Sequence, residues 1–275
     1  MVLKYLFKKE TIESGMRKFW NDLKKYKNYL LYATKANLKA EVAGSYLNWL
    51  WWILDPLLFM LVYSFVALIV FGKGEPYFPV FVFIGLNSWN FFNKSVNKSV
   101  KLIRSYRGML SKIYIPKYVL VLITLMENLF KMTVSFVLVA IMLPVYRVPL
   151  SWCVVNIIPS FLVMIVFTFG CSCIVLHAGV HFSDLANIIT VLLRLIFYMS
   201  GIFYSIPRRV GEPYGTYLLH VNPMAFLINA LRDSLLYSQM VNYGVLLIFL
   251  VIGCILSVIG IKLIIKYENN YVKVI

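Results

Sequence analysis

The chain has 275 residues, of which 61% are hydrophobic and 16% aromatic, whereas a soluble globular domain has roughly 45–50% apolar residues. This composition excludes an ordinary soluble enzyme or binding module and indicates an integral membrane protein. The 27 lysines and arginines exceed the 11 acidic residues, and in a membrane protein such an excess points to topology and anionic lipid before nucleic acid.

The N-terminal arm, residues 1–45, contains the first predicted element. Between Phe19 and Lys39, apolar residues recur at the spacing of one helix face. Lysines occupy the other faces, among them Lys24, Lys25, Lys27 and Lys35. We expect an amphipathic helix on the inner surface of the membrane, whose basic side meets either anionic lipid or a cytoplasmic subunit.

Six segments are apolar enough to span a bilayer, which takes roughly 20 residues. They cover residues 47–71, 78–93, 116–144, 152–176, 185–205 and 241–265. Of the 27 basic residues, 20 lie in the arm, in residues 94–117 or in the C-terminal tail, and lysine and arginine accumulate on cytoplasmic loops. The prediction is an all-α integral membrane protein with a six-span transmembrane domain over residues 46–275 and both termini in the cytoplasm.

The gap between the second and third segments, residues 94–117, has seven basic residues and no acidic one. Five of them recur every three or four residues and would share one helix face: Lys94, Lys98, Lys101, Arg104 and Arg107. We expect the second span to continue as a helix to about Gly108, and Pro116 to occupy the first turn of the next helix. The basic run either sets topology alone or contacts an acidic or phosphate-bearing partner or an anionic substrate head group.

Four ionisable residues lie within apolar segments, where each costs roughly 2.5–3.5 kcal/mol on insertion scales: Asp55, Glu127, Lys131 and Arg194. Glu127 and Lys131 are four residues apart, in the order that favours an ion pair on one helix, and Arg194 can share Glu127. Asp55 precedes Pro56, which is expected to bend or break its helix. These charges either pair for structural reasons or line a polar passage.

Residues 204–240, on the opposite side, are too polar and too often interrupted by proline to cross the bilayer. Asn222 and Pro223 fit an N-cap and the first position of a helix. That helix would bury an apolar side and expose a polar one, with Asn229, Arg232 and Asp233 on the polar side. Two short helices here either close the outer end of a passage or form a simple folded loop.

The sequence lacks the common motifs for catalysis and cofactor binding. It contains no G-x-x-x-x-G-K-[ST] phosphate loop, no H-E-x-x-H or G-x-S-x-G pattern and no metal-binding spacing of its histidines or four cysteines. We predict a chain without catalytic residues, metal or cofactor of its own. The competing hypothesis, a membrane enzyme acting on lipid-linked sugars, needs acids that converge at one membrane face, whereas the available acids are scattered along the sequence: Asp55, Glu127, Asp184, Glu212 and Asp233.

Six sequence stretches, taken together, resemble one known family. In chain order they are AEVAGSYLNWLWWILDPLLFMLVYSFV, FPVFVFIGLNSWNFF, LIRSYRGMLSKIYIPKYVL, HFSDLANI, YMSGIFYSIP and LLHVNPMAFLINALRDSLL. Their order and spacing across about residues 33–237 are similar to those of the membrane subunits of ABC transporters that export lipid-linked polysaccharides and teichoic acids.

The resemblance implies a homodimer of six-span subunits with two copies of a cytoplasmic ATP-binding subunit, which bind the ATP and magnesium. It implies that residues 104–115 form a coupling helix that enters a cleft on the ATPase, that residues 21–40 form an interface helix beside it, and that residues 204–237 form outer gate helices. The residues expected to contact the ATPase are Arg104, Tyr106, Arg107, Met109 and Lys112.

The resemblance also implies a substrate passage lined by aromatic residues, although packing in the core or against lipid is the alternative for each. The candidates are Trp49, Trp52, Phe59, Tyr63, Trp89, Phe91 and Phe92. Lys94, Lys98 and Lys101 would lie at the cytoplasmic entrance, where a diphosphate head group arrives. Members of the family often carry glutamine before the proline of the first span, whereas this sequence has Asp55.

The leading hypothesis is the channel-forming permease subunit of an ATP-driven exporter in the bacterial cytoplasmic membrane. Its cargo would be a polysaccharide, O-antigen or teichoic acid linked to undecaprenyl diphosphate. The lysine- and asparagine-rich composition is typical of an AT-rich genome and on that ground slightly favours teichoic acid. A permease for a smaller lipid or drug would have the same topology and is the alternative.

Overall fold

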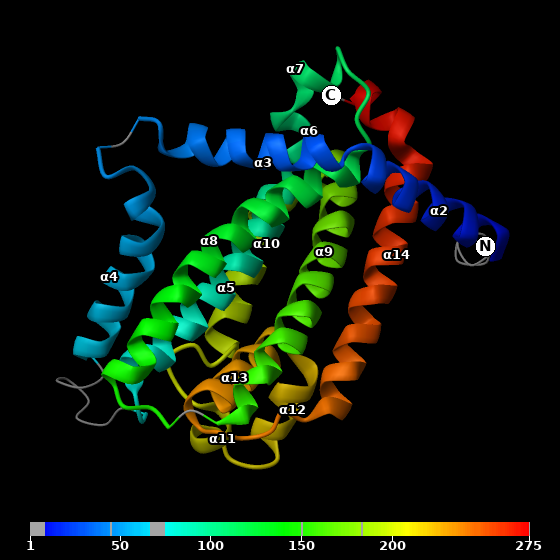
Figure 1. Cartoon of the computed structure of the whole chain (residues 1–275). Coiled ribbons are helices and arrows are strands. Elements are labelled where there is room, and N and C mark those ends of the chain that lie inside the picture. Colours follow the sequence, from blue (N-terminus) through cyan, green and yellow to red (C-terminus); the bar gives the residue numbers. More distant parts are fainter. Residues whose placement is uncertain (1–8, 45, 67–74, 150, 183, 275) are drawn as a thin grey trace.

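The computed structural model describes residues 9–44, 46–66, 75–149, 151–182 and 184–274, and the regular structure within these ranges is helical (Figure 1). The long helices of the bundle are α4 (Trp51–Phe65), α5 (Phe78–Val100), α8 (Lys117–Val145), α9 (Ile157–His181), α10 (Leu185–Met199) and α14 (Tyr243–Val274). The arm forms α2 (Lys9–Lys25) and α3 (Lys27–Val42), which lie across one end of the bundle. Short 3-10 helices, Asn48–Leu50 and Trp152–Asn156, precede α4 and α9.

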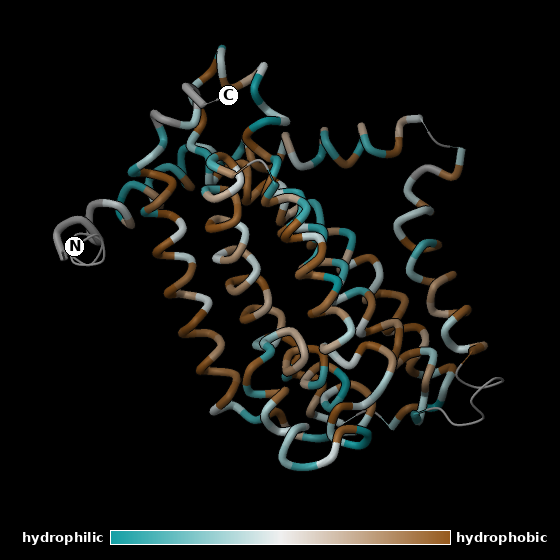
Figure 2. The backbone as a smooth tube through the Cα atoms, turned by 180° about the vertical axis from the view of Figure 1, so that it is seen from behind, coloured by the Kyte–Doolittle hydropathy of each residue, from teal (hydrophilic) through white to brown (hydrophobic). Residues whose placement is uncertain are grey.

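Short helices occupy both ends of the bundle. Next to α3 lie α6 (Leu102–Ser105) and α7 (Arg107–Leu110), in the connection from α5 to α8. At the opposite end lie α11 (Ile206–Arg209), α12 (Tyr214–Val221) and α13 (Pro223–Leu236). Figure 2 shows apolar residues along the long helices and hydrophilic residues gathered towards these two ends.

Within the described ranges, three helical segments are long and apolar enough to cross a membrane: α8, the segment Trp152–His181 that contains α9, and Tyr243–Glu268 of α14. Helices α4 and α10 are apolar but have only 15 residues each. Helix α5 is apolar in its first half, and its second half carries asparagines and lysines. These features agree with the predicted all-α membrane protein at a coarse level.

Helix α5 is the centre of the core, because its residues from Val80 to Trp89 are all buried between neighbouring helices. Helix α14 packs closely along α9. A Cβ atom on Gly170 of α9 would lie 2.8 Å from Leu256 Cβ, and one on Gly260 of α14 would lie 2.5 Å from Cys173 Cβ. Small residues therefore allow the two backbones to approach, as is common between membrane helices.

Four predicted helix limits differ from the structure. The arm is two helices, because the backbone leaves helical geometry at Tyr26. Helix α5 ends at Val100 and two separate single-turn helices follow, so no continuous helix reaches Gly108. Pro116 has an extended ψ of 130° and precedes α8, one position earlier than predicted. Helix α4 continues through Pro56, its sixth residue, at the loss of one backbone hydrogen bond, which membrane helices tolerate where neighbouring groups satisfy the freed carbonyl.

Candidate functional site

Segment 101–116, which joins α5 to α8, has an apolar side on the bundle and a basic side facing outward. Leu102, Ile103, Leu110 and Ile115 are buried. The exposed basic residues are Lys101, Arg104, Arg107 and Lys112. Their charges are thus available to a partner, whereas Tyr106 and Met109 are half-buried.

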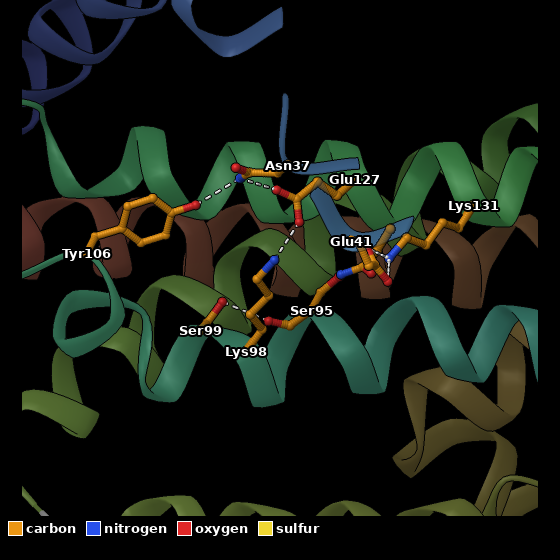
Figure 3. Close-up of polar contacts among 9 residues, drawn as sticks. Asn37, Glu41, Ser95, Lys98, Ser99, Tyr106, Glu127 and Lys131 are labelled. Atoms are coloured by element: carbon orange, nitrogen blue, oxygen red, sulfur yellow. Dashed lines mark hydrogen bonds and ion pairs between the residues drawn. The ribbon is translucent and has the colours of Figure 1, made fainter. Parts of the chain in front are cut away.

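Helix α3 of the arm holds this segment in place through side-chain hydrogen bonds (Figure 3). The Asn37 amide donates to the Tyr106 hydroxyl at 2.8 Å and to Glu127 Oε1 of α8 at 2.6 Å. The Tyr29 hydroxyl donates to the Met109 sulfur at 3.6 Å. Asn37 therefore joins three elements, namely the arm, the loop segment and α8. We call Asn37, Lys98, Tyr106 and Glu127 the junction.

The predicted ion pair between Glu127 and Lys131 is wrong, because each residue pairs with another helix. Glu127, which is only 1% exposed, accepts from Lys98 Nζ of α5 at 2.6 Å and from Asn37. Lys131 Nζ lies 2.5 and 2.7 Å from the two Glu41 oxygens of α3 (Figure 3). A buried carboxylate needs several donors to offset its desolvation, and two other helices supply them. The suggested sharing of Glu127 by Arg194 is also wrong, since Arg194 is exposed on α10.

The far end of the loop segment is fixed by α2 and α14. The Tyr114 hydroxyl donates to Glu268 Oε2 at 3.0 Å, and Lys117 Nζ lies 3.5 Å from Glu268 Oε1. Partial burial and the nearby Glu268 carboxylate raise the pKa of Tyr114 above its ordinary value, which is consistent with its hydroxyl acting as the donor. Tyr118 donates to Asp22 of α2. The residue spacing gave no sign of this cluster, because up to 154 positions separate its bonded partners.

The lysines predicted for the interface helix lie on both arm helices, and all are exposed: Lys24, Lys25, Lys27 and Lys35. Because the arm also contacts α8 and α14, it is tied to the bundle and still offers basic side chains to the outside. Their contact with anionic lipid or with a cytoplasmic subunit stays a prediction.

A cleft of about 350 Å³ lies next to the junction, between the end of α3 and the helices α4, α5 and α8. Five residues predicted for the passage or as intramembrane charges line it: Trp52, Asp55, Phe91, Lys94 and Lys131. The sequence pattern placed these residues in three spans and the gap after the second, and it could not bring them together.

The other aromatic candidates lie outside this cleft. Trp89 and Phe92 are buried, with ring centres 5.6 Å from Phe197 and 6.1 Å from Phe167 respectively, as the core-packing alternative expects. Tyr63 stacks on Phe203 with ring centres 3.8 Å apart. Two further candidates are exposed, Trp49 and Phe59.

At the opposite end, the N-cap of α13 is confirmed, because the Asn222 side chain accepts from the amides of Met224 and Ala225 at 3.1 and 3.2 Å. The predicted exposure of Arg232 is wrong, since its guanidinium is buried. It donates to three backbone carbonyls, those of Phe81 at 3.1 Å and of Gly201 and Ile202 at 2.7 Å each. A guanidinium has enough donors for several carbonyls at once, and here it locks α13 onto α5.

Comparison with known proteins places the junction and the cleft within a matched region. A family model described as ABC-2 type transporter matches residues 30–236. The O-antigen export system permease protein RfbA of Myxococcus xanthus is 31% identical over 209 residues, which cover 76% of this chain and 80% of that protein. An RfbA protein of Klebsiella pneumoniae is 28% identical over 249 residues, or 90% of this chain and 94% of that protein. The polysialic acid transport protein KpsM of Escherichia coli is 24% identical over 196 residues, or 69% of this chain and 74% of that protein.

Proposed function

The chain belongs to the ABC-2 type transporter family, and from this membership we propose that it is the permease subunit of a bacterial exporter of lipid-linked polysaccharide. The observation that carries the proposal is the family match over residues 30–236, with O-antigen export permeases among the relatives that cover most of the chain. The chain is a transport subunit, and its role is to move a cargo across the membrane, without a chemical conversion of its own.

We propose that the energy comes from a separate ATP-binding subunit, which holds ATP and magnesium and contacts residues 104–115. The exposed side chains of Arg104, Arg107 and Lys112 support this contact, since they stand out from a segment whose apolar side is anchored. Movement of that segment would reach α8 through the bonds of Asn37 to Tyr106 and Glu127, and α5 through Lys98. Such a rearrangement of packed helices is a usual form of conformational coupling.

For the architecture of the transporter, we propose six spans with both termini in the cytoplasm and two copies of the chain around the passage. Helices α11, α12 and α13 would form a gate at its outer end. The lipid carrier would be undecaprenyl diphosphate. The O-antigen export permeases among the relatives favour a polysaccharide such as O-antigen as the cargo. Teichoic acid is favoured only by the amino-acid composition.

Deleting the gene from its host tests the proposed function. Cells without the chain should continue to synthesise the glycan and accumulate it on the inner side of the membrane, where externally added antibody or glycosidase cannot reach it. A plasmid copy should restore surface display. Normal display in the deletion strain, together with loss of export of a small lipid or drug, would instead support the alternative permease.

A further inference from the structure

The cleft between α3, α4, α5 and α8 is polar where a membrane bundle is normally apolar. Of its fourteen lining residues, eight are polar or charged: Glu41, Asp55, Asn87, Asn90, Lys94, Asn128, Lys131 and Ser135. From Lys94, the polar wall of α5 extends back to Asn87, about 10 Å along the helix at 1.5 Å per residue. Lysines can reach towards an interface, whereas asparagine side chains are too short to do so. Polar groups kept at such depth are usually functional.

Two asparagines of the cleft, Asn87 on α5 and Asn128 on α8, are fixed in orientation and have capacity left for a ligand. Asn87 and Asn128 are 4% and 6% exposed. The Asn87 amide donates to the Phe83 carbonyl at 2.8 Å, and the Asn128 amide donates to Ser95 Oγ at 3.0 Å. An asparagine amide can form about four hydrogen bonds, so each retains both donor and acceptor capacity.

The charges of the cleft balance, which argues against an anionic ligand. Glu41 and Lys131 neutralise each other. Asp55 on α4 and Lys94 on α5 contribute one charge of each sign, and no ion pair joins these two described residues. A phosphate in the cleft would therefore face a carboxylate as well as an ammonium group, whereas a hydroxyl-rich neutral molecule can use both.

Trp52 adds an aromatic side chain to the polar lining of the cleft. Trp52 is held by Phe130, with ring centres 5.9 Å apart and nearly perpendicular planes, and by Lys131 Nζ, 5.6 Å from the Trp52 ring centre. A held indole beside amides and a carboxylate suits a sugar ring, which has a C–H face for aromatic packing and a rim of hydroxyls for hydrogen bonds. The volume of about 350 Å³ is at the lower end of ligand pockets, which span roughly 300–1,000 Å³.

We propose that this cleft is a subsite, within a single copy of the chain, for an uncharged sugar unit of the exported glycan. Asp55 accepts hydrogen bonds from sugar hydroxyls, Asn90 and its neighbours on α5 and α8 donate and accept, and Trp52 packs against the ring. The inference rests on the proposed function, because only a glycan exporter brings such a ligand to the cleft.

Saturation-transfer NMR on the full chain with its ATPase in nanodiscs tests the subsite. The probes are the methyl glycosides of glucose, galactose, rhamnose and N-acetylglucosamine, with glycerol 1-phosphate as the anionic comparator and inorganic phosphate, which has no C–H protons to observe, as a competitor. We expect transfer to at least one glycoside and about tenfold weaker binding in Asp55→Leu and in Asn90→Leu, since each loses one or two hydrogen bonds. Glu212→Gln, in an exposed acid at the other end of the molecule, is the matched control and should bind normally.

The conservative variant Asp55→Asn separates a sugar site from an anion site. An amide keeps the hydrogen-bonding capacity and removes the repelling charge, so glycoside binding should stay within about threefold of the wild type. Stronger binding of glycerol 1-phosphate than of any glycoside in the wild type overturns the proposal, and so does transfer to none of the glycosides. The gene deletion measures export independently of binding to the cleft. If the deletion strain retains the glycan inside but the chain binds no glycoside, the subsite alone is refuted. If the deletion strain displays the glycan normally, the proposed function is refuted, whatever the cleft binds.

Discussion

At the scale of single residues, the burial of the Glu127 carboxylate is the energetically most costly feature of the junction. Its carboxylate is almost inaccessible to solvent and bonds to Lys98 and Asn37 from two other helices. Removing one partner of a buried pair leaves an uncompensated charge, while removing both charges can be nearly neutral. This asymmetry makes the pair testable by a double-mutant cycle.

Replacing Lys98 with methionine should destabilise the chain by about 2 kcal/mol, below the 3–5 kcal/mol of fully buried pairs because the lysine is half-exposed. The double variant with Glu127→Gln should regain most of that loss. Thermal unfolding of the detergent-solubilised chain measures both. Lys94→Met, one turn away on α5 and exposed, serves as the control and should change stability little. Additive losses in the double variant would mean that the two side chains do not interact.

Arg232 poses a different problem, because its three acceptors are backbone carbonyls on two separate segments. Lysine has one ammonium group and cannot reproduce the planar fork of guanidinium donors. We therefore expect Arg232→Lys to destabilise the chain nearly as much as Arg232→Met, by about 3 kcal/mol in each case.

The control for this prediction is Arg209→Met, which breaks a half-exposed pair with Glu75. Such pairs contribute about 0–1 kcal/mol, so the variant should unfold close to the wild-type temperature. Full rescue by lysine at position 232 would show that charge alone, without the fork geometry, satisfies the site.

Sequence reasoning found the charged residues of the core but assigned their partners wrongly. Spacing along one helix suggested Glu127 with Lys131, since only local neighbours are visible in a sequence. The actual partners Lys98 and Glu41 come from other helices, and only tertiary packing brings them close. The same limit explains Arg232, whose polar character suggested exposure although backbone carbonyls were available inside.

At the scale of elements, the end of α5 depends on its crossing with α9. A Cβ atom on Gly179 of α9 would lie 2.2 Å from the Val100 carbonyl oxygen and 3.0 Å from the Val100 carbonyl carbon. These are backbone atoms, so relief requires a movement of the helix end itself. Because segment 101–116 starts there, a shift of Val100 would displace the surface that we propose for the ATPase.

We expect Gly179→Ala to reduce glycan export at least tenfold, while the variant still inserts in the membrane. The measurement is surface display of the glycan, normalised to the amount of chain in the membrane. Gly44→Ala is the matched control, because nothing lies within 4 Å of a Cβ at this position after α3, and Gly44 lies outside the segment proposed to contact the ATPase. Export by Gly179→Ala at the wild-type level would mean that the crossing tolerates a shift without consequence for the loop.

The spacing of basic residues predicted helical structure in this region correctly but not its interruptions. A step of three residues suits one long helix and also suits the single turns α6 and α7. The break at Lys101, where the backbone turns to φ −99° and ψ 4°, lies beside the contact of Val100 with Gly179. The N-cap of α13, by contrast, was predictable, because Asn222 and Pro223 act on their own helix.

At the scale of the whole molecule, composition and hydropathy were enough to predict a membrane bundle with a basic end. They could not show that the arm folds back over that end and bonds to the loop segment and to α8. The consequence is mechanical: the surface proposed for the ATPase and the helices proposed for the passage share the hydrogen bonds of Asn37. Binding of the ATPase and transmission of its movement should therefore be separable.

We predict that Asn37→Leu keeps the ATPase bound but lowers glycan export about tenfold, the equivalent of about 1.4 kcal/mol for the loss of hydrogen bonds to Tyr106 and to the charged Glu127. Binding is measured by crosslinking a cysteine placed at the exposed Arg107 to the ATPase, in a chain whose four native cysteines are replaced by serine. Lys39→Gln, which changes an exposed residue of the same helix, should leave crosslink and export unchanged. Loss of the crosslink in Asn37→Leu would show that Asn37 only keeps the loop folded, and unchanged export would show that movement reaches the passage by another route, such as the Glu268 contacts of Tyr114 and Lys117.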